Sequence, residues 1–496
     1  MGLDLGTSSA KGVALDATGA VAARAVADYP TQRPAPHAAE QDPALWLRAC
    51  TEVVAALRDE VDPAGWQGIG LSGMIPTLVV LDERLGPLAP AVTWEDARAE
   101  DCGERLREAV GADWLYERTG QWLDGRYLLA MYERLARDEP AVGTRARHLA
   151  GAKDLLFAWL TGELLTDPST AAGYGAYDAR DEAWLAEPLD ALEAALGAPA
   201  PALPAVAPSD SIRPLSATAA LTLGLGAGLP ICLGAADSVL GALGLGVRAP
   251  GDIAYISGTS SVVLAVAPEW RCDEQHRYLL TPLAEPGFHG LEMDLLATGS
   301  AVRWLSQLLG GGRDEAELVA LAGEVAPAQA PAFLPYLAPG EQGALWNAEL
   351  RGTVAGLDLG HGPAHLARGL LNGIVLESRR CLEVLADAGD VGTAGELRVA
   401  GWCAADRGVR RDLADACRRP VRAAPADGRD CSAIGAARLL ALSLGDPLPD
   451  VALIAAGDYV APDEARVRDW DQLWERHERL RLATTTKPRE ALCTGS

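Results

Sequence analysis

Two loops with the sequence Gly-Thr-Ser-Ser, at residues 6–9 and 258–261, occur once in each half of the 496-residue chain. Each lies between two short apolar segments, so each is expected to be a turn between antiparallel strands. Such a turn presents backbone N–H groups and hydroxyls together, and its glycine lets the backbone approach an anion closely. Two such loops facing each other would hold a polyphosphate from both sides. The alternative is that Gly, Ser and Thr are good turn residues anywhere, and four residues alone do not decide between the two.

Asp4 is a carboxylate two residues before the first of these loops. Its predicted role is to hold Mg²⁺, through water, because Mg²⁺ in proteins takes one or two carboxylates together with phosphate oxygens. The alternative is a carboxylate at the end of a strand that caps the turn. The P-loop motif G-x-x-x-x-G-K-[ST] does not occur in the sequence, which argues against a P-loop nucleotide site.

Asp237 is a second carboxylate of interest, because it stands alone among the small and apolar residues 233–246 and is expected to be buried there. An aspartate in such a place can accept a hydroxyl proton as the alcohol attacks a γ-phosphate, a step typically worth about 10²–10⁴ in rate. The alternative is an N-cap at the start of an apolar helix, and Asp237 taken alone favours that interpretation.

The elements that must position these residues follow a layered α/β pattern. Residues 1–30 alternate apolar segments with Gly-rich turns and predict an antiparallel meander, and residues 199–208 predict a proline-rich surface connector near the end of a first domain. Further strands are predicted on both sides of the second loop, at residues 68–73, and at residues 396–402, the last one buried and ending in a loop. Helices are predicted at residues 43–61, 297–310, 366–385, 410–417 and 463–482.

Length and composition limit the number of domains, the classes of partner and the compartment to be expected. A chain of 496 residues is long for one hydrophobic core, so two domains are expected. Sixty-eight acidic against 43 basic residues give a net charge of −25, which argues against nucleic acid and anionic membranes as partners. The nine cysteines form no C-x-x-C pair, and scattered reduced thiols suit the cytosol. Without a leader peptide or an apolar run of about 18 residues, the chain is expected to be cytoplasmic.

Several stretches, taken in order, resemble the FGGY family of carbohydrate kinases over essentially all of residues 1–482. Those stretches are residues 3–16, 70–99, 153–173, 234–252, 256–263, 333–352 and 397–408. The resemblance implies that Asp4 holds the metal ion and that Asp237 is the general base. The residues implied to bind ATP are Gly6, Thr7, Ser8, Lys11, Gly258, Thr259, Ser260, Gly299, Gly401 and Trp402. The residues implied to bind the substrate are Met74, Ile75, Pro76, Trp94, Glu95, Asp96, Arg98 and Ser238.

The resemblance also implies the fold and the cofactors. The fold is α/β, with two actin-like lobes, each built on a ribonuclease-H-like sheet, and a catalytic cleft between them. The N-terminal lobe is expected at residues 1–245, the C-terminal lobe at 246–482, and a disordered tail at 483–496. ATP and Mg²⁺ are the implied cofactors, and a homodimer is compatible with the resemblance alone.

Three departures from the family pattern concern the substrate and the nucleotide. Where xylulokinase-type members read S-G-Q-M-H-G, residues 72–77 read S-G-M-I-P-T, so that Met74 and Pro76 replace polar residues. Ser238 stands where an amide residue is usual. Residues 401–404 read G-W-C-A in place of G-G-G-A, so Trp402 either stacks on the adenine or fills the space and weakens binding.

The expected activity is ATP- and Mg²⁺-dependent phosphorylation of a small carbohydrate, with a pentulose such as xylulose slightly ahead of gluconate or a polyol. Residues 343–352 resemble the gluconate and polyol branches more than the xylulokinase version of that segment. A kinase-derived protein of a specialised pathway, or one with a sensing role, is a further alternative. An actin- or chaperone-like ATPase is disfavoured, because it needs no sugar-binding segment.

Overall fold

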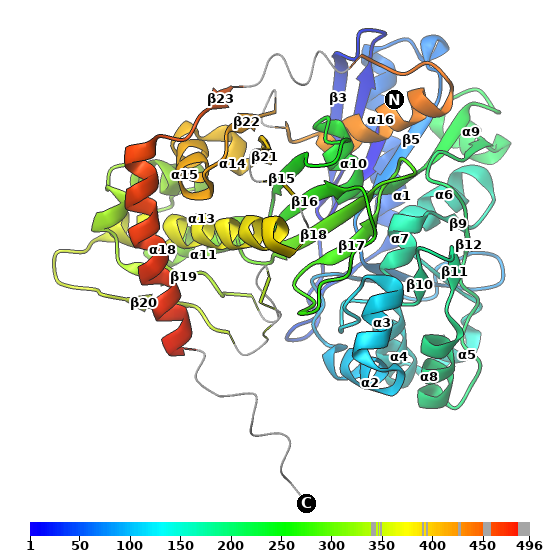
Figure 1. Ribbon diagram of the computed structural model, residues 1–496. Helices are drawn as coiled ribbons and strands as arrows, with labels where there is room; N and C mark the ends of the chain where they lie inside the picture. The colour runs from blue at the N-terminus through cyan, green and yellow to red at the C-terminus, as the bar shows by residue number, and fades with distance from the viewer. Residues whose placement is uncertain are drawn as a thin grey trace, which may run out of the picture. The chain divides into compact units, whose positions relative to one another are not determined.

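The N-terminal meander forms one side of a six-stranded mixed sheet in the computed structural model of the protein (Figure 1). Its strands are β1 (Gly2–Leu5), β2 (Ser9–Leu15), β3 (Val21–Asp28), β5 (Ile69–Gly73), β13 (Ile212–Pro214) and β14 (Pro230–Ala236). They lie in the order β13-β14-β5-β1-β2-β3. β1 pairs antiparallel with β2 and parallel with β5, and β14 continues the parallel part. The antiparallel meander and the strand at residues 68–73 are therefore confirmed.

A second sheet of seven strands contains the second loop. Its strands are β15 (Ile253–Ser257), β16 (Ser261–Ala267), β17 (Leu279–Pro282), β18 (His289–Leu295), β21 (Leu397–Gly401), β22 (Val421–Ala423) and β23 (Tyr459–Val460). They lie in the order β17-β18-β16-β15-β21-β22-β23. β15 pairs antiparallel with β16 and parallel with β21.

The two sheets repeat one arrangement of strands. In each, a hairpin encloses a Gly-Thr-Ser-Ser loop, the first hairpin strand pairs parallel with a later strand, and that strand pairs parallel with another. An antiparallel strand, β13 or β23, then follows. The two loops thus occupy equivalent positions of a duplicated α/β unit, and chance repetition of a turn sequence does not account for them.

The structure describes residues 1–338, 344–345, 347, 350–388, 391–392, 395–424, 428–449 and 458–484. The chain divides into two compact units that are discontinuous in sequence. The first unit is Met1–Pro250, Val266–Leu291 and Asp430–Ala456, and the second is Gly251–Ala265, Glu292–Arg429 and Gly457–Ser496. The expected lobes, 1–245 and 246–482, follow chain order and stay a prediction. Of the expected disordered tail, residues 485–496 lie outside the described residues, and residues 483–484 belong to the last helix.

The helices divide between the two units. Those of the first unit are α1 (Pro43–Glu60), α2 (Glu100–Val110), α3 (Ala112–Thr119), α4 (Leu128–Asp138), α5 (Pro140–Arg145), α6 (Ala152–Thr161), α7 (Pro168–Ala172), α8 (Ala186–Leu196), α9 (Ala217–Leu223), α10 (Asp237–Gly244) and α16 (Cys431–Ser443). Those of the second unit are α11 (Gly299–Leu309), α12 (Glu315–Ala322), α13 (Pro363–Ala388), α14 (Trp402–Ala405), α15 (Arg407–Cys417) and α18 (Glu464–Thr484). Five of them confirm the helices predicted from the sequence.

Shorter strands complete the fold. A four-stranded sheet in the order β4-β7-β6-β8 consists of β4 (Glu40–Gln41), β6 (Thr77–Leu81), β7 (Ala91–Thr93) and β8 (His148–Ala150). Three two-stranded pairs are β9 (Leu165–Thr166) with β12 (Ala205–Val206), β10 (Tyr177–Asp178) with β11 (Ala183–Trp184), and β19 (Ala332–Leu334) with β20 (Thr353–Ala355). Two predictions need correction here. The proline-rich connector contains β12 and is tied to β9, and the strand at residues 396–402 ends in the short helix α14 rather than in a loop.

α16 packs on the first sheet although it comes late in the chain (Figure 1). A Cβ on Gly2 would lie 1.8 Å from the carbonyl oxygen of Ala433, and one on Gly70 would lie 2.0 Å from that of Ala436. These glycines let the helix approach β1 and β5 closely. A side chain at either position would push α16 away from the sheet.

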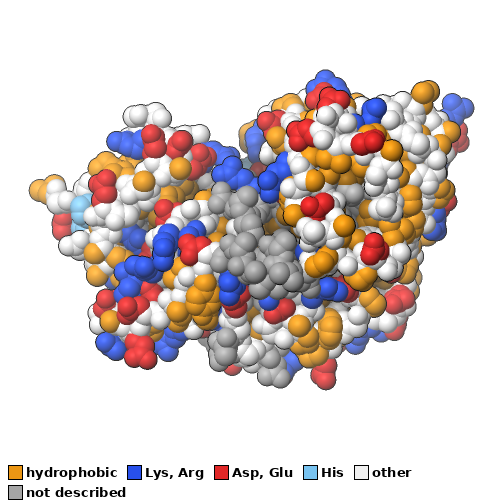
Figure 2. All heavy atoms as spheres, turned by 90° about the horizontal axis from the view of Figure 1, so that it is seen from above, with side chains coloured by type: hydrophobic (Ala, Val, Ile, Leu, Met, Phe, Trp, Pro, Cys, Tyr) orange, Lys and Arg blue, Asp and Glu red, His pale blue; other side chains and the backbone are white. Residues whose placement is uncertain are grey.

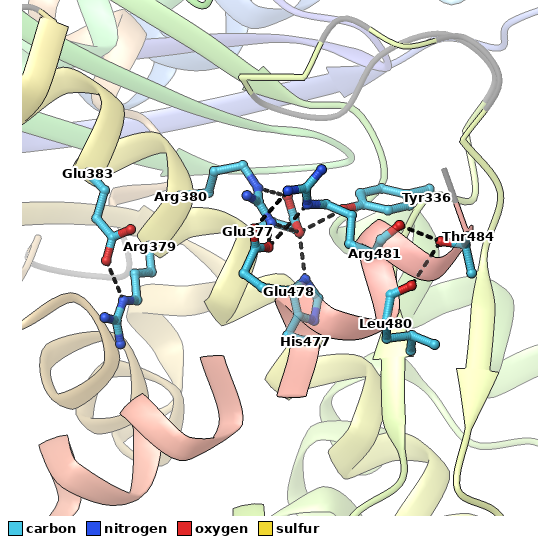
Figure 3. A network of polar contacts seen from close by, with 10 residues as sticks. All are labelled: Tyr336, Glu377, Arg379, Arg380, Glu383, His477, Glu478, Leu480, Arg481 and Thr484. Carbon is cyan, nitrogen blue, oxygen red and sulfur yellow. Dashed lines mark hydrogen bonds and ion pairs between the residues drawn. The ribbon is translucent and has the colours of Figure 1, made fainter. Parts of the chain in front are cut away.

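A buried cluster of charged and polar side chains joins α13 to α18 in the second unit (Figure 3). Glu377 accepts hydrogen bonds from Tyr336 Oη at 2.8 Å and His477 Nε2 at 2.6 Å, and it pairs with Arg380. Arg380 also pairs with Glu478. Burial alone would raise the pKa of Glu377, but Arg380 and His477 together lower it far below its ordinary value. Glu377 is therefore ionised and fully compensated.

The free energy of unfolding is expected to fall as the solution is acidified, because of Glu478. Burial would raise the pKa of Glu478, but Arg380 and Arg481 lower it from 4.5 to about 2. Since the folded-state pKa is the lower one, this carboxylate stabilises the fold fully above pH 4.5, and its contribution is lost as the pH falls toward 2. Urea unfolding of the wild type and of Glu478→Gln across this range checks the expectation. The variant should show the shallower pH dependence, and equal slopes would contradict the assignment.

The surface seen in Figure 2 carries Lys and Arg side chains interspersed with Asp and Glu and with apolar side chains. The excess of acidic residues is thus not gathered into a single patch on this face. Within the described residues, no helix combines the length and the apolar character needed to cross a membrane.

Candidate functional site

Asp4 lies on β1, between two residues of the neighbouring strands. Lys11 on β2 and Ser72 on β5 are its register partners. Ser72 Oγ donates a hydrogen bond to Asp4 Oδ1 at 2.7 Å. Burial raises the pKa of Asp4, and Lys11 and Ser72 act in the opposite direction. The second oxygen, Oδ2, lies 3.6 Å from where a Cβ on Gly6 would be, so it faces the first loop across a residue without a side chain.

The first loop is held by the segment that was predicted to bind the substrate. Gly6 N donates to Ser9 O at 3.1 Å, which closes the turn. Gln41 Nε2 donates to Thr7 O at 2.7 Å, and Trp94 Nε1 donates to Thr7 Oγ1 at 3.0 Å. Trp94 and the first loop are therefore direct neighbours, although the sequence separates them widely. Of the other predicted residues here, Ser8 is exposed and Lys11 is half-buried.

Asp237 is the first residue of α10, directly after the end of β14. Its Oδ1 accepts a hydrogen bond from Ser238 N at 2.9 Å, and the N-cap position belongs to Ala236. Asp237 is half-buried, so the expectation of a buried carboxylate was wrong. The reason is its place at the sheet end: the rest of α10 is buried, whereas the first residue emerges from the sheet. A negative charge is favoured at this helix end by the helix dipole.

The end of β5 lies beside this carboxylate. β5 and β14 are parallel, with Gly73 opposite Ala236, so the residues after each strand leave the sheet at the same edge. Met74 is 1% exposed and belongs to the hydrophobic core of the first unit. Ile75 and Pro76, joined by a cis peptide bond, are half-buried. Their side chains are therefore more accessible to a small ligand than that of Met74.

The W-x-D-x-R segment forms an ion-paired turn. Asp96 is 1% exposed and accepts from Ala39 N at 2.9 Å and from Arg98 Nη2 at 2.6 Å. Arg98 also pairs with Glu40 at 2.5 Å. Burial would lower the pKa of Arg98, but Asp96 and Glu40 raise it above its ordinary value. Glu95, the remaining predicted residue, pairs with Arg33 at 3.0 Å. Asp96 and Arg98 thus fix the turn that carries Trp94.

Two buried hydroxyls in this region have no hydrogen-bond partner among the described residues: Ser238 Oγ and Thr77 Oγ1. Ser238 is 6% exposed and Thr77 is 1% exposed. Leaving a buried hydroxyl unpaired costs about 1–3 kcal/mol, so each is a candidate to bind a ligand hydroxyl. Thr77 was not among the predicted site residues. Its signal in the sequence was its place as the one polar residue closing the otherwise apolar run of residues 74–77.

The second loop is anchored to the start of α11. Gly258 N donates to Ser260 O at 2.7 Å, and Ser300 N donates to Thr259 O at 3.0 Å. A Cβ on Gly299 would lie 2.2 Å from the carbonyl oxygen of Gly258. Gly299 is therefore needed for this close approach, and the predicted residues Gly258, Thr259, Ser260 and Gly299 come together in the second unit.

Trp402 lies beside the same group. A Cβ on Gly299 would be 3.3 Å from Trp402 Nε1, and that nitrogen is buried with no hydrogen-bond partner within the described part of the chain. Gly401, the residue before it, has φ +82°, and a Cβ there would lie 1.7 Å from Ser257 O, so only glycine fits. Trp402 thus offers an N–H donor next to the second loop and the start of α11.

The repeat of the fold reveals one chemical asymmetry. Asp4 on β1 corresponds to Ile256 on β15. Each lies two residues before the glycine of its loop, and each belongs to the second residue pair of its hairpin, counted from the loop. The strand that leads into the first loop therefore carries a carboxylate at this position, whereas the strand that leads into the second loop carries an isoleucine. In the described part of the chain, no group of three or more His, Cys, Asp or Glu side chains is arranged to hold a metal ion. A cation at Asp4 would need its remaining ligands from water and from phosphate oxygens. The predicted approach of the two loops to each other concerns both units and stays a prediction.

Comparisons with known proteins agree with this geometry. Residues 1–244 match the N-terminal domain of the FGGY family of carbohydrate kinases, and residues 253–444 match the C-terminal domain. The xylulose kinase of Lactococcus lactis is 30% identical over 390 residues, covering 78% of this chain and 76% of that protein. The gluconokinase of Bacillus subtilis is 26% identical over 427 residues, covering 84% of this chain and 82% of that protein.

A solved structure shows the same fold. The crystal structure of xylulose kinase from Rhodospirillum rubrum superimposes with a TM-score of 0.85 at 31% sequence identity. It covers 97% of this chain and 98% of the other. The family resemblance and the two-domain α/β fold predicted from the sequence are therefore confirmed.

Proposed function

Because the chain belongs to the FGGY family of carbohydrate kinases and is itself a carbohydrate kinase, we propose that it transfers the γ-phosphoryl group of ATP to a hydroxyl of a pentulose such as xylulose. The observation that carries the proposal is the shared edge of β1, β5 and β14. These three strands are neighbours and run parallel: Asp4 lies one residue before the end of β1, Ile75 and Pro76 follow β5, and Asp237 follows β14.

Asp237 is assigned as the general base. It takes the proton of the substrate hydroxyl as that oxygen attacks the γ-phosphorus in line, and the γ-phosphorus–oxygen bond to the leaving ADP breaks. Its position at the first turn of α10 supports this role, because the residue is half-buried rather than buried and a negative charge is favoured at a helix N-terminus.

The unpaired hydroxyls support a polyhydroxylated substrate. Ser238 Oγ and Thr77 Oγ1 are each able to donate to, or accept from, a sugar hydroxyl, which removes the cost of leaving them unpaired. Ile75 and Pro76 offer apolar contact to the C–H face of the sugar. Trp94 joins this region to the first loop through its hydrogen bond to Thr7.

The nucleotide is assigned to the loops and to Trp402. Backbone N–H groups of both loops and the side chain of Lys11 suit phosphate oxygens. The unpaired indole N–H of Trp402 beside Gly299 supports a hydrogen bond to the nucleotide rather than a blocked site. Asp4 fits Mg²⁺, because one oxygen is held by Ser72 and the other faces the glycine of the first loop. Mg²⁺ bound there would neutralise charge on the phosphates.

Gluconate or a polyol is the second candidate substrate. Met74 and Pro76 replace residues that are polar in xylulokinase-type members, and Met74 is buried in the core. The relative named gluconokinase also covers slightly more of this chain than the relative named xylulose kinase. A relative named glycerol kinase is also 30% identical, over 90% of this chain. The pentulose is preferred because the solved structure at 31% identity is named xylulose kinase, as are relatives at 30% and 31% identity.

The test is release of ADP from Mg-ATP in the presence of a panel of ketoses, aldonates and polyols. We expect kcat/KM to be highest for a pentulose, with D-xylulose as the first compound to try. A higher kcat/KM for gluconate or for glycerol would assign the second candidate. ADP release that no member of the panel stimulates would contradict the proposed activity.

A further inference from the structure

Lys153 is a lysine with no exposed side-chain area, at the start of α6 in the first unit. Its Nζ lies 3.0 Å from Asp167 Oδ1 and 3.6 Å from Asp154 Oδ1, and it donates to the backbone oxygen of Leu233 at 3.3 Å. Burial alone would lower the pKa of Lys153, but Asp167 and Asp154 raise it above its ordinary value. The ammonium group is therefore charged, and it contacts two carboxylates and one backbone carbonyl.

Asp167 collects hydrogen bonds from several hydroxyls. Ser169 donates to its Oδ2 from the backbone N at 3.0 Å and from Oγ at 2.5 Å. Thr170 Oγ1 donates to Oδ1 at 2.6 Å, and Ser209 Oγ donates to Oδ2 at 3.3 Å. Asp167 has no exposed area, so its charge is balanced entirely by Lys153 and these donors.

Ser169 connects this buried pair to β14, the strand that ends at Ala236 directly before Asp237. A serine hydroxyl has one proton, and that of Ser169 is given to Asp167, so its oxygen is free to accept. It accepts from the backbone N of Ala236 at 2.9 Å, the residue directly before Asp237. Neither Thr170 nor Ser209 makes a side-chain hydrogen bond of this kind to β14 in the described structure.

The hydrogen bonds that Lys153 and Ser169 make to β14 lie on either side of an irregularity in the pairing of this strand. Pairing between β14 and β5 shifts register between Cys232 and Ala235. Gly234, inside the shift, has φ +73°, and a Cβ there would lie 1.6 Å from Leu71 O. Lys153 binds the carbonyl of Leu233 just before this glycine, and Ser169 binds the N–H of Ala236 just after it. The bulge is thereby fixed on both sides, and a bulge re-aims the residues that follow it.

We propose that Lys153, Asp167 and Ser169 are positioning residues that set the place of Asp237 through β14. None of the three is assigned a contact with the sugar or with ATP. They act through the backbone of residues 233–236, and the inference rests on the proposed role of Asp237. A base displaced by about 1 Å from its productive place can cost up to about 10²-fold in rate, so fixing this strand end is a catalytic requirement.

The decisive variant is Ser169→Ala. It removes the bond to Ala236 N and leaves the Lys153–Asp167 ion pair intact. We expect kcat to fall about 10- to 100-fold, while the KM for ATP changes little, because none of the groups assigned to the nucleotide lies on β14 or α10. Lys153→Met is less informative, since it removes the cation that pairs with the buried carboxylate of Asp167, and a loss of folding from that cause alone would hide the effect on Asp237.

Two controls each remove one hydroxyl from the same carboxylate, and neither hydroxyl bonds to β14. The backbone of Ser209 does contact β14, because its carbonyl accepts from Gly234 N at 2.9 Å, so Thr170→Val is the stricter control. Ser209→Ala deletes the 3.3 Å bond, and Thr170→Val deletes the 2.6 Å bond with little change of shape. Both are expected to keep kcat near that of the wild type. Thermal unfolding of all three variants records how much stability each has lost. Assays use D-xylulose with Mg-ATP, or the best acceptor of the panel if that is another sugar.

The result expected is a loss of kcat in Ser169→Ala that exceeds the loss in either control at similar stability. The inference is overturned if Ser169→Ala retains wild-type kcat, or if all three variants lose kcat in proportion to their stability. Asp237→Asn, measured in the same assay, distinguishes failure of this inference from failure of the general-base assignment. If Asp237→Asn is inactive and Ser169→Ala is fully active, only this inference fails. If a folded Asp237→Asn retains activity, the base assignment fails and the inference falls with it.

Discussion

Replacement of Asp237 by asparagine is expected to lower kcat for sugar phosphorylation by about 10²–10⁴-fold, with little change in stability. Asparagine has nearly the same shape and still accepts the hydrogen bond from Ser238 N, so α10 should begin as it does in the wild type. What it lacks is the ability to take a proton from the attacking hydroxyl. The KM for ATP should stay near its wild-type value, because the nucleotide groups are assigned elsewhere.

The control for Asp237→Asn is Asp210→Asn, which removes one carboxylate from an exposed turn of the same unit. It changes the net charge by the same amount and should leave kcat unaffected. Steady-state ADP release and thermal unfolding are measured for both variants. A folded Asp237→Asn protein that phosphorylates sugar at a near-normal rate would refute the general-base role.

Replacement of Glu377 by glutamine is expected to lower the free energy of unfolding by about 3–5 kcal/mol, the usual cost of removing one partner from a buried ion pair. Glu377 is 1% exposed and joins Arg380, His477 and Tyr336 in one cluster (Figure 3). Glutamine keeps an oxygen but lacks the charge that compensates Arg380 and supports the contact with α18.

The matched control is Glu383→Gln on the same helix. Glu383 pairs with Arg379 at 2.6 Å, but its side chain is 50% exposed. An exposed pair one turn apart on a helix contributes about 0.3–0.5 kcal/mol, so this variant should be nearly as stable as the wild type. Urea unfolding followed by far-ultraviolet circular dichroism measures both. Equal, small losses for the two variants would show that the buried cluster does not hold the second unit together.

Local sequence patterns predicted most of the elements, for identifiable reasons. The Gly-rich turns and alternating apolar residues of the first 30 positions specify a meander, because turn chemistry and strand periodicity are both local. The two loops were found for the same reason. Their equivalence was implied by the family resemblance, and the structure supplies the strand order that establishes it, because strand order depends on pairing between distant segments.

What the sequence could not predict depends on contacts between distant residues. α16 packs on β1 and β5 although it follows them by several hundred residues, and its helical pattern does not say which sheet it covers. The half-buried state of Asp237 follows from the point at which β14 ends, which a run of apolar residues does not mark. Likewise, the partners of Lys153 include a carbonyl on β14, so the buried lysine was visible only as part of a family-like stretch.

The predicted substrate residues illustrate the same limit. The W-x-D-x-R residues were expected to bind the substrate by resemblance, and the structure shows that Trp94 contacts the first loop. The ion pairs of Asp96 with Arg98 and of Glu95 with Arg33 were not predictable from spacing. Met74 was predicted to contact the substrate from its position alone, and its burial in the core shifts the expected contacts to Ile75 and Pro76. Thr77 enters as a candidate only because its hydroxyl lacks a partner within the described residues.

The measurement that tests the account most directly is a product balance with Mg-ATP and D-xylulose. ADP and phosphorylated pentulose are quantified in the same reaction, for the wild type and for Asp237→Asn. We predict one phosphorylated pentulose for each ADP formed by the wild type, and neither product above background with the variant. ADP formed without phosphorylated sugar, or a folded variant that forms both products at the wild-type rate, would contradict the account.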